Sequence, residues 1–245
     1  MAEEGAPAVS GIAPDLLVLA ADQARLEGVG EGFLLSLLPD SQRLAISRYR
    51  RVEDRMGRLL ARLLLGAGLN MLEGWSRSRA LAALAHEPEG RPFLQGGRRE
   101  ISFSHAGRWS VCAIGDGAAT GRVGVDVEAI RPLAAEEFTL VFSRPELEAI
   151  RSSPDPYREL IRRWTIKEAV LKARGRGFLE DPLTVDSGCS PEAGLSADRY
   201  WEHLPLAEGY WLTVAAERRW NNLKTVFPSA EALLALADGR GTDNQ

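Results

Sequence analysis

The order of apolar and polar positions predicts short strands that alternate with helices from residue 14 onward. A short apolar run between turn-forming residues predicts a buried strand at residues 15–20. A second apolar run, residues 33–38, leads through a proline into a helix predicted at residues 42–49. The leucine pattern of residues 52–65 then predicts a long helix, which should end at the glycines of residues 66–68.

The same order recurs in the second part of the chain. Residues 123–127 predict a strand, residues 138–150 hold an apolar run, a proline turn and a helix, and a long helix follows. Such recurrence is typical of an internal duplication. It predicts an α+β fold of two similar halves, residues 14–120 and 121–245, in one compact unit. Residues 1–13 are predicted to be a disordered lead.

Further strands are predicted outside this repeat. Two alternating runs, residues 101–104 and 109–114, predict a β-hairpin with His105 at its turn. Histidine at a turn is usually only solvated, and less often binds a ligand. In the second half the pattern predicts strands at residues 183–186, 199–203 and 210–217, and a last helix at residues 230–237 that begins after Ser229.

Charged residues break the apolar face of a helix predicted through Leu160, Ile161, Trp164 and Leu171, which Gly175 and Gly177 should stop. At about 100° per residue, Glu168 lies within the stripe that should be buried, and Lys167 lies on its edge. Lys172 follows one turn after Glu168 on the same flank. Charged side chains are almost never fully buried without a partner. The helix therefore either buries an ion pair or presents a carboxylate and two ammonium groups to a charged ligand.

Two acidic residues mark the strand predicted at residues 123–127: Asp126 lies on it, and Glu128 directly follows it. Asp126 and Glu128 should point to the same face, with Cα atoms roughly 6.5 Å apart. This D-x-E spacing is common on a solvent-facing strand, but two such carboxylates also suit one hard cation. Together with Glu168 they would supply the oxygen ligands that Mg²⁺ takes beside substrate phosphates. The pattern then predicts phosphoryl or phosphate-ester transfer on a polyanionic substrate.

Composition excludes several other classes of protein. The 245 residues carry a net charge of −4 with a pI near 5.6, which argues against a dedicated nucleic-acid-binding protein. Cys112 and Cys189 form neither a disulfide framework nor a CxxC zinc site. The start of the chain lacks a signal-peptide pattern, and no apolar run approaches the roughly 20 residues of a membrane helix. We expect a cytoplasmic protein with no membrane or nucleic-acid partner.

Five motifs, taken together and in order, resemble the signatures of the 4′-phosphopantetheinyl transferases. GVDVE at residues 124–128 and WTIKEAVLKARGRG at residues 164–177 are similar to the two main patterns of that family, (I/V)G(I/V)D(I/V)E and WxxKEAxxKxxGxG. GRPFL at residues 90–94, FSHAG at residues 103–107 and FSRPE at residues 142–146 resemble its G-(K/R)-P, Ser-His and FSxxE elements. The length and the duplication resemble the monomeric Sfp-type branch, in which the active site lies between two similar halves.

The resemblance implies transfer of phosphopantetheine from coenzyme A to a serine of an apo acyl or peptidyl carrier protein. Adenosine 3′,5′-bisphosphate would be released. Asp126, Glu128 and Glu168 would hold Mg²⁺ against the pyrophosphate. Glu168 or Glu146 is the candidate base for the carrier serine, and the complete match of its motif favours Glu168.

Other motif residues are implied to bind coenzyme A. Lys167 and Lys172 would contact the pyrophosphate, and Ser104 and His105 would contact the nucleotide phosphate region. Arg91 and Pro92 would flank the adenosine end. Arg58 would reach the 3′-phosphate. Lys167 is also a candidate catalytic residue. The chain departs from the family pattern at Ala106, where a second serine is common, and in having arginines where lysines usually precede the first long helix.

Two other functions fit parts of the pattern. D-x-E with a lysine near a third acid also suits a metal-dependent nuclease, but the acidic net charge argues against nucleic-acid binding. A carrier- or nucleotide-binding module without turnover would be expected to lose at least one of the charged motif residues, and all of them are present.

Overall fold

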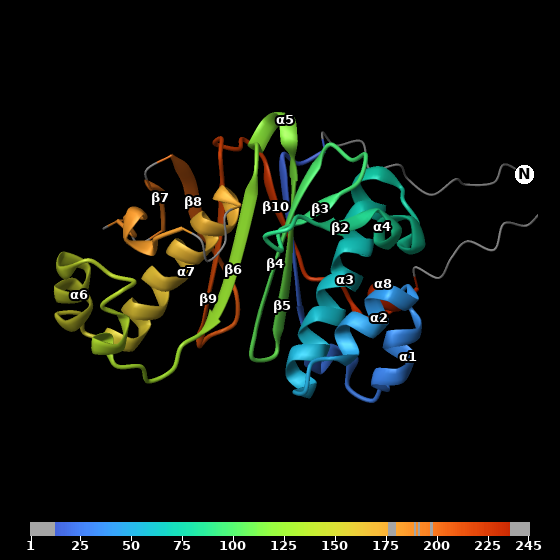
Figure 1. The fold of residues 1–245 in the computed structure, drawn as a ribbon, viewed down its shortest axis with the longest axis horizontal. Coiled ribbons are helices and arrows are strands. Elements are labelled where there is room, and N and C mark those ends of the chain that lie inside the picture. Colours follow the sequence, from blue (N-terminus) through green and yellow to red (C-terminus); the bar gives the residue numbers. More distant parts are fainter. Residues whose placement is uncertain (1–12, 176–179, 189, 191, 197, 236–245) are drawn as a thin grey trace, which may run out of the picture.

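Two four-stranded sheets lie at the centre of the molecule, between helices that cover their outer faces (Figure 1). The computed structural model describes residues 13–175, 180–188, 190, 192–196 and 198–235. The strand order is β10-β1-β5-β4 in the first sheet and β6-β9-β8-β7 in the second, which confirms the predicted α+β fold. The strands of the first sheet are β1 (Leu16–Asp22), β4 (Arg99–Ala106), β5 (Trp109–Asp116) and β10 (Leu223–Val226). Those of the second are β6 (Val123–Ala129), β7 (Ala193–Ser196), β8 (Arg199–Leu204) and β9 (Tyr210–Ala216).

Strand β1 is buried along its whole length because it contacts a different core on each face. Leu17 and Leu19 pack towards the long helix α3 (Val52–Glu73), whereas Leu16 and Val18 pack towards the second sheet. This explains its unbroken apolar run, since a strand covered on both faces needs no polar positions. The two sheets are thus held face to face by one core, and a second core lies under α3.

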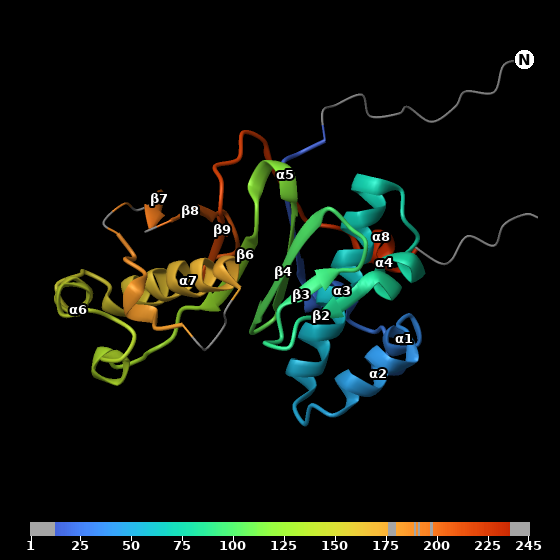
Figure 2. The ribbon, with the colours of Figure 1, turned by 45° about the horizontal axis from the view of Figure 1, so that its top comes forward.

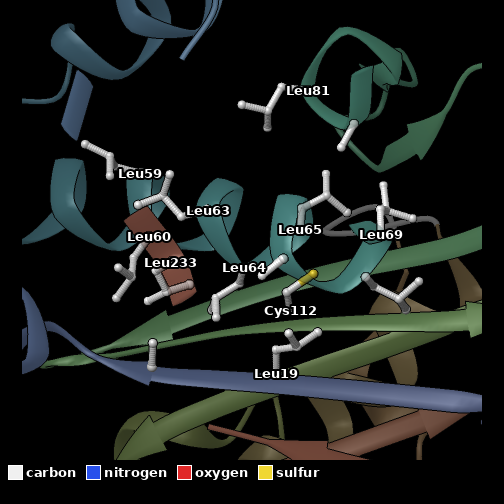
Figure 3. Packing of buried hydrophobic residues seen from close by; sticks show 14 of the residues in the cluster. Leu19, Leu59, Leu60, Leu63, Leu64, Leu65, Leu69, Leu81, Cys112 and Leu233 are labelled. Atoms are coloured by element: carbon white, nitrogen blue, oxygen red, sulfur yellow. The ribbon is translucent and has the colours of Figure 1, made fainter. Parts of the chain in front are cut away.

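Helix α3 continues beyond its predicted end. The prediction that residues 66–68 stop it is wrong, because Gly66 and Gly68 lie inside the helix, which ends at Gly74 in the left-handed conformation. A Cβ on Gly68 would lie 2.4 Å from Ile114 Cδ1, so the missing side chain lets the helix pack directly on β5. The leucines of α3 meet Leu19 and Cys112 of the sheet there (Figure 3).

The predicted hairpin and the smaller elements of the first half surround this core. Strands β4 and β5 pair antiparallel as predicted, but His105 pairs with Ser110 inside the ladder and does not lie at the turn. The apolar run at residues 33–38 forms most of a short helix. The remaining elements are η1 (Gln23–Leu26), α1 (Glu31–Ser36), α2 (Asp40–Ser47), α4 (Arg77–Ala83), β2 (Leu84–His86), β3 (Pro92–Leu94) and α5 (Gly117–Thr120).

In the second half, helix α7 (Pro156–Arg174) lies on the face of the second sheet that points away from the first sheet. The predicted pair β8–β9 is antiparallel, which confirms it. The strand predicted at residues 183–186 is wrong. A 3₁₀ helix, η4 (Pro182–Thr184), forms there because Pro182 begins the turn and the Asp181 side chain caps it. The other elements are η2 (Ala135–Phe138), α6 (Arg144–Arg151) and α8 (Ala230–Leu234), with Ser229 capping α8 as predicted.

The chain crosses between the sheets more than once. The predicted boundary at residues 120 and 121 falls between α5 and β6, where the chain first passes to the second sheet. After β9 it returns, because β10 pairs parallel with β1 and Leu233 of α8 joins the core under α3. Figure 2 shows α8 beside α3 and α4. Within the described residues, no helix combines the length and the apolarity needed to cross a membrane. Predictions for residues 1–12, 176–178, 189 and 236–237 lie outside the described residues.

Candidate functional site

A cleft of about 570 Å³ lies between the two halves and is lined from both. Helix α3, the β2–β3 loop and β4 form one side, and β6 and α7 form the other. Nine of the predicted site residues line it: Arg58, Arg91, Pro92, Ser104, His105, Asp126, Glu128, Glu168 and Lys172.

The close contact of β6 with α7 depends on Gly124. A Cβ at this position would lie 2.0 Å from the carbonyl oxygen of Ala169 and 2.5 Å from the amide nitrogen of Ala173. Since both are backbone atoms of α7, any side chain would push the helix away. Glycine therefore brings the acidic face of β6 against the turn of α7 that carries Glu168 and Lys172.

Asp126 is the most buried acid of the cleft, with 3% of its surface exposed. Its Oδ1 accepts hydrogen bonds from Ser104 Oγ at 2.9 Å and from Lys172 Nζ at 2.7 Å. Its Oδ2 is buried and has no hydrogen-bond partner among the described residues. Burial raises the pKa of Asp126, and the charge of Lys172 opposes that shift. The carboxylate thus keeps one oxygen free for a further ligand.

The charge of Asp126 shifts the pKa of two more carboxylates of the cleft. Burial and the charge of Asp126 raise the pKa of Glu128 to about 7, although Trp164 Nε1 donates to its Oε1 at 3.3 Å. The same two causes, burial and Asp126, raise the pKa of Glu168. Because the charge of Asp126 disfavours the ionisation of both glutamates, a bound cation would stabilise this site.

The acidic group suits Mg²⁺ in chemical kind, because all its donors are carboxylate oxygens and Asp126 Oδ2 lacks a partner. As the side chains stand, no set of three or more acidic, histidine or cysteine side chains in the described part of the chain is placed to hold a metal ion. Asp126 Oδ1 is instead paired with Lys172. The three acids alone therefore do not enclose a metal ion. They fit an open site, in which other ligands would complete the coordination of Mg²⁺.

The opposite wall of the cleft is basic. The guanidinium of Arg58 lies 4.0 Å from the centre of the Tyr49 ring, and its Nε is buried with no hydrogen-bond partner among the described residues. Arg62, one turn further along α3, donates from Nη1 to the carbonyl oxygen of Arg58 at 2.9 Å. Burial and the charge of Arg58 lower the pKa of Arg62 to about 10, so it remains a cation at neutral pH.

Two histidines complete this wall. Burial, followed by the charge of nearby arginines, lowers the pKa of both His105 and His86. Arg62 and His86 were not among the predicted site residues. The recurrence of arginines at three- to four-residue spacing on α3 was a sequence signal for Arg62, whereas His86 begins a polar stretch of the sequence and gave none.

The structure does not bring Lys167 and Glu146 to the cleft. Lys167 has no exposed surface, and its Nζ lies 3.1 Å from Glu146 Oε1 and donates to the carbonyl oxygens of Pro182 and Val185. Burial would raise the pKa of Glu146, but hydrogen bonds led by that from Ser187, together with the charge of Lys167, lower it to about 2. This pair is the internal ion pair that the helix pattern had left open as one alternative.

Comparison with known proteins gives consistent matches. The family model described as "4'-phosphopantetheinyl transferase superfamily" matches residues 122–215. The chain is 33% identical over 159 residues to the 4′-phosphopantetheinyl transferase HetI of Nostoc sp., which covers 61% of this chain and 63% of the relative. It is 30% identical over 153 residues to the 4′-phosphopantetheinyl transferase gsp of Aneurinibacillus migulanus, with 60% of each chain covered. The match to psf-1 of Bacillus pumilus, also a 4′-phosphopantetheinyl transferase, is 27% over 140 residues and covers 56% of this chain and 58% of that protein. The matches thus span about three fifths of these relatives.

Proposed function

We propose that this chain is a member of the 4′-phosphopantetheinyl transferase superfamily, whose family model matches residues 122–215, and that it transfers phosphopantetheine from coenzyme A to a serine of an apo carrier protein. The observation that carries the proposal is the composition of the cleft. One side holds three carboxylates and Lys172, and the opposite side holds arginines and histidines. A substrate with a pyrophosphate and a separate phosphate has the charges that such a cleft would bind.

The acidic side of the cleft would hold Mg²⁺ through Asp126, Glu128 and Glu168. When bound, Mg²⁺ would neutralise charge on the pyrophosphate, and substrate oxygens and water would complete its ligands. Lys172 lies next to Asp126 and would share its charge with the same phosphates. The free oxygen of Asp126 supports this assignment.

The basic side would bind the nucleotide end of coenzyme A. Arg58, Arg62 and His105 line this side of the cleft, and the two arginines would supply positive charge for a phosphate. Arg91 and Pro92 line the cleft on the β2–β3 side, where the adenosine would lie. Arg91 is held in place there by ion pairs with Glu87 and Glu100.

Glu168 is the better-placed candidate for the general base. Its carboxylate lines the cleft, whereas that of Glu146 is bonded to Ser143, Ser187 and Lys167 away from it. In the proposed step the carrier serine oxygen bonds to the phosphorus that bears the pantetheine arm, and its proton passes to Glu168. The bond from that phosphorus to the bridging oxygen breaks, and adenosine 3′,5′-bisphosphate leaves. The raised pKa of Glu168 favours its holding that proton.

The decisive experiment is incubation with coenzyme A, Mg²⁺ and a panel of apo acyl and peptidyl carrier proteins, followed by intact-mass measurement. We expect at least one carrier to gain the mass of a phosphopantetheine group. If every carrier keeps its apo mass, the proposed transfer is refuted. We further propose that the protein acts as a cytoplasmic monomer, because one chain supplies both sides of the cleft; light scattering in solution tests the monomer.

Substitution of the acids tests their proposed roles. We expect Asp126→Ala and Glu168→Ala to lower the rate of transfer by about 10³-fold or more, as losses at reacting groups do. Circular dichroism should show an intact fold in both. Glu148→Ala, on the exposed face of α6, is the matched control and should keep the wild-type rate. Wild-type transfer by either cleft variant would remove that residue from the site.

A further inference from the structure

The edge of β6 that faces β4 is an open strand edge at the floor of the cleft. β6 is the end strand of the second sheet and β4 the end strand of the first, so no backbone ladder joins them. They nevertheless lie side by side, as both ribbon views show (Figures 1 and 2). An open edge leaves backbone N–H and C=O groups without partners, which is costly where water is excluded.

Two serine side chains of β4 satisfy this edge. The amide of Val125 donates to Ser102 Oγ at 3.0 Å, and the amide of Val127 donates to Ser104 Oγ at 3.2 Å. Both serines are buried. Lys172 adds a third bond, from its Nζ to the carbonyl oxygen of Val125 at 3.1 Å. Side chains thus take the place of a neighbouring strand.

The hydroxyl of Ser104 has no hydrogen-bonding capacity left over. A hydroxyl can donate one hydrogen bond and accept two. Ser104 donates to Asp126 Oδ1, and it accepts from the amide of Val127 and from Lys172 Nζ at 3.2 Å. A phosphate could bind this hydroxyl only by displacing one of these partners.

We infer that Ser102 and Ser104 are positioning residues, whose hydroxyls fix the edge of β6 against β4 and thereby hold the Asp126 carboxylate in the cleft. The role of Ser104 is then to orient Asp126, in place of the phosphate contact that the sequence motif implied. The part of this inference that concerns catalysis rests on the proposed function; the part that concerns the strand edge does not.

Amide hydrogen exchange of the folded protein, resolved by NMR, tests the strand edge without any activity measurement. We expect Ser104→Ala to accelerate exchange at Val127, and Ser102→Ala to accelerate exchange at Val125, each by about tenfold, which is the usual effect of losing one buried hydrogen bond. Ser110→Ala is the matched control: this buried serine of β5 bonds to the carbonyl oxygen of Gly57 and should leave both amides unchanged. Unchanged exchange at Val125 in Ser102→Ala and at Val127 in Ser104→Ala would overturn the inference.

Kinetics then separate positioning from phosphate binding. With Ser104→Ala we expect kcat to fall about tenfold while KM for coenzyme A changes less than twofold, and Ser104→Thr, which keeps the hydroxyl, to recover most of kcat. A raised KM with unchanged kcat would overturn the positioning role, since it would mean that Ser104 binds the substrate. If the wild type transfers nothing, the proposed function fails while the exchange measurement still decides the strand edge. If Ser104→Ala does not fold, Ser102→Ala still tests the strand edge through the amide exchange of Val125.

Discussion

At the scale of single residues, His203 is a partly buried histidine whose ring contacts two tryptophans. Its ring centre is 5.2 Å from that of Trp201 and 4.5 Å from that of Trp211. Nδ1 bonds to Thr213 Oγ1 at 2.8 Å, and Nε2 is buried with no hydrogen-bond partner among the described residues. Burial and the charge of Arg162 lower the pKa of His203 to about 4, against the opposing charge of Glu159.

This pKa makes the stability of the fold depend on pH. Between about pH 6.5 and pH 4 the unfolded chain binds a proton at this histidine and the folded chain does not, so acid favours unfolding. We expect the free energy of unfolding of the wild type to fall by ~2 kcal/mol more than that of His203→Gln across this window. Urea denaturation at four pH values measures it. Equal slopes for the two proteins would contradict the assignment.

The residues of α7 show what one sequence can and cannot determine at this scale. The helical pattern marked Lys167 and Glu168 as charges near a buried face, and it left an ion pair and a ligand site as alternatives. Both occur, one for each residue, because adjacent positions point about 100° apart on a helix. Glu168 faces the cleft, whereas Lys167 meets Glu146. The partner of Lys167 comes from a separate helix, which the pattern of α7 alone could not identify.

At the scale of elements, glycines decide how closely helices pack on sheets. Gly124 lets α7 contact β6, with the backbone of Ala169 and Ala173 in the space that a side chain would need. We expect Gly124→Ala to move α7 away and lengthen the 2.7 Å contact of Lys172 with Asp126. The expected cost is about 3 kcal/mol of stability, as for overpacked cores, with loss of transfer. Chemical denaturation and the carrier assay measure both.

Gly32→Ala is the matched control for this substitution. A Cβ at Gly32 would meet no atom within 4 Å, and the residue lies in helix α1. Alanine should therefore leave stability unchanged or raise it slightly, because alanine favours helices. If Gly124→Ala behaves like this control, the close approach of α7 to β6 is not what holds the cleft together.

Alternation predicted two strand pairs and a serine predicted one helix cap, whereas the end of α3 depends on packing and was missed. The hairpin β4–β5, the β8–β9 pair and the cap of α8 follow from alternation and from Ser229, which are local features. The end of α3 was wrong because Gly66 and Gly68 serve contacts with residues distant in sequence. The five motifs predicted the family to which the comparisons also find a match, because their order constrains more than any single spacing does.

At the scale of the whole molecule, the return of β10 and α8 to the first half could not be predicted from the apparent duplication. Two similar halves suggested one crossing of the chain, yet the parallel pairing of β10 with β1 ties the end of the described chain to its beginning. Helix α8 adds Leu233 to the leucine core of α3, beside Leu60 and Leu64 (Figure 3). The first half is therefore complete only when the last elements are in place.

This arrangement predicts that damage to the last helix weakens the first half. Leu233 is fully buried, so we expect Leu233→Ala to lower the free energy of unfolding by about 3 kcal/mol. Amide exchange should quicken in β1 and β5 as well as in α8, because these strands share its core. Glu231→Ala, on the exposed side of the same helix, should change neither quantity. Faster exchange confined to α8 would contradict this prediction, because it would mean that the core of the first half is stable without Leu233.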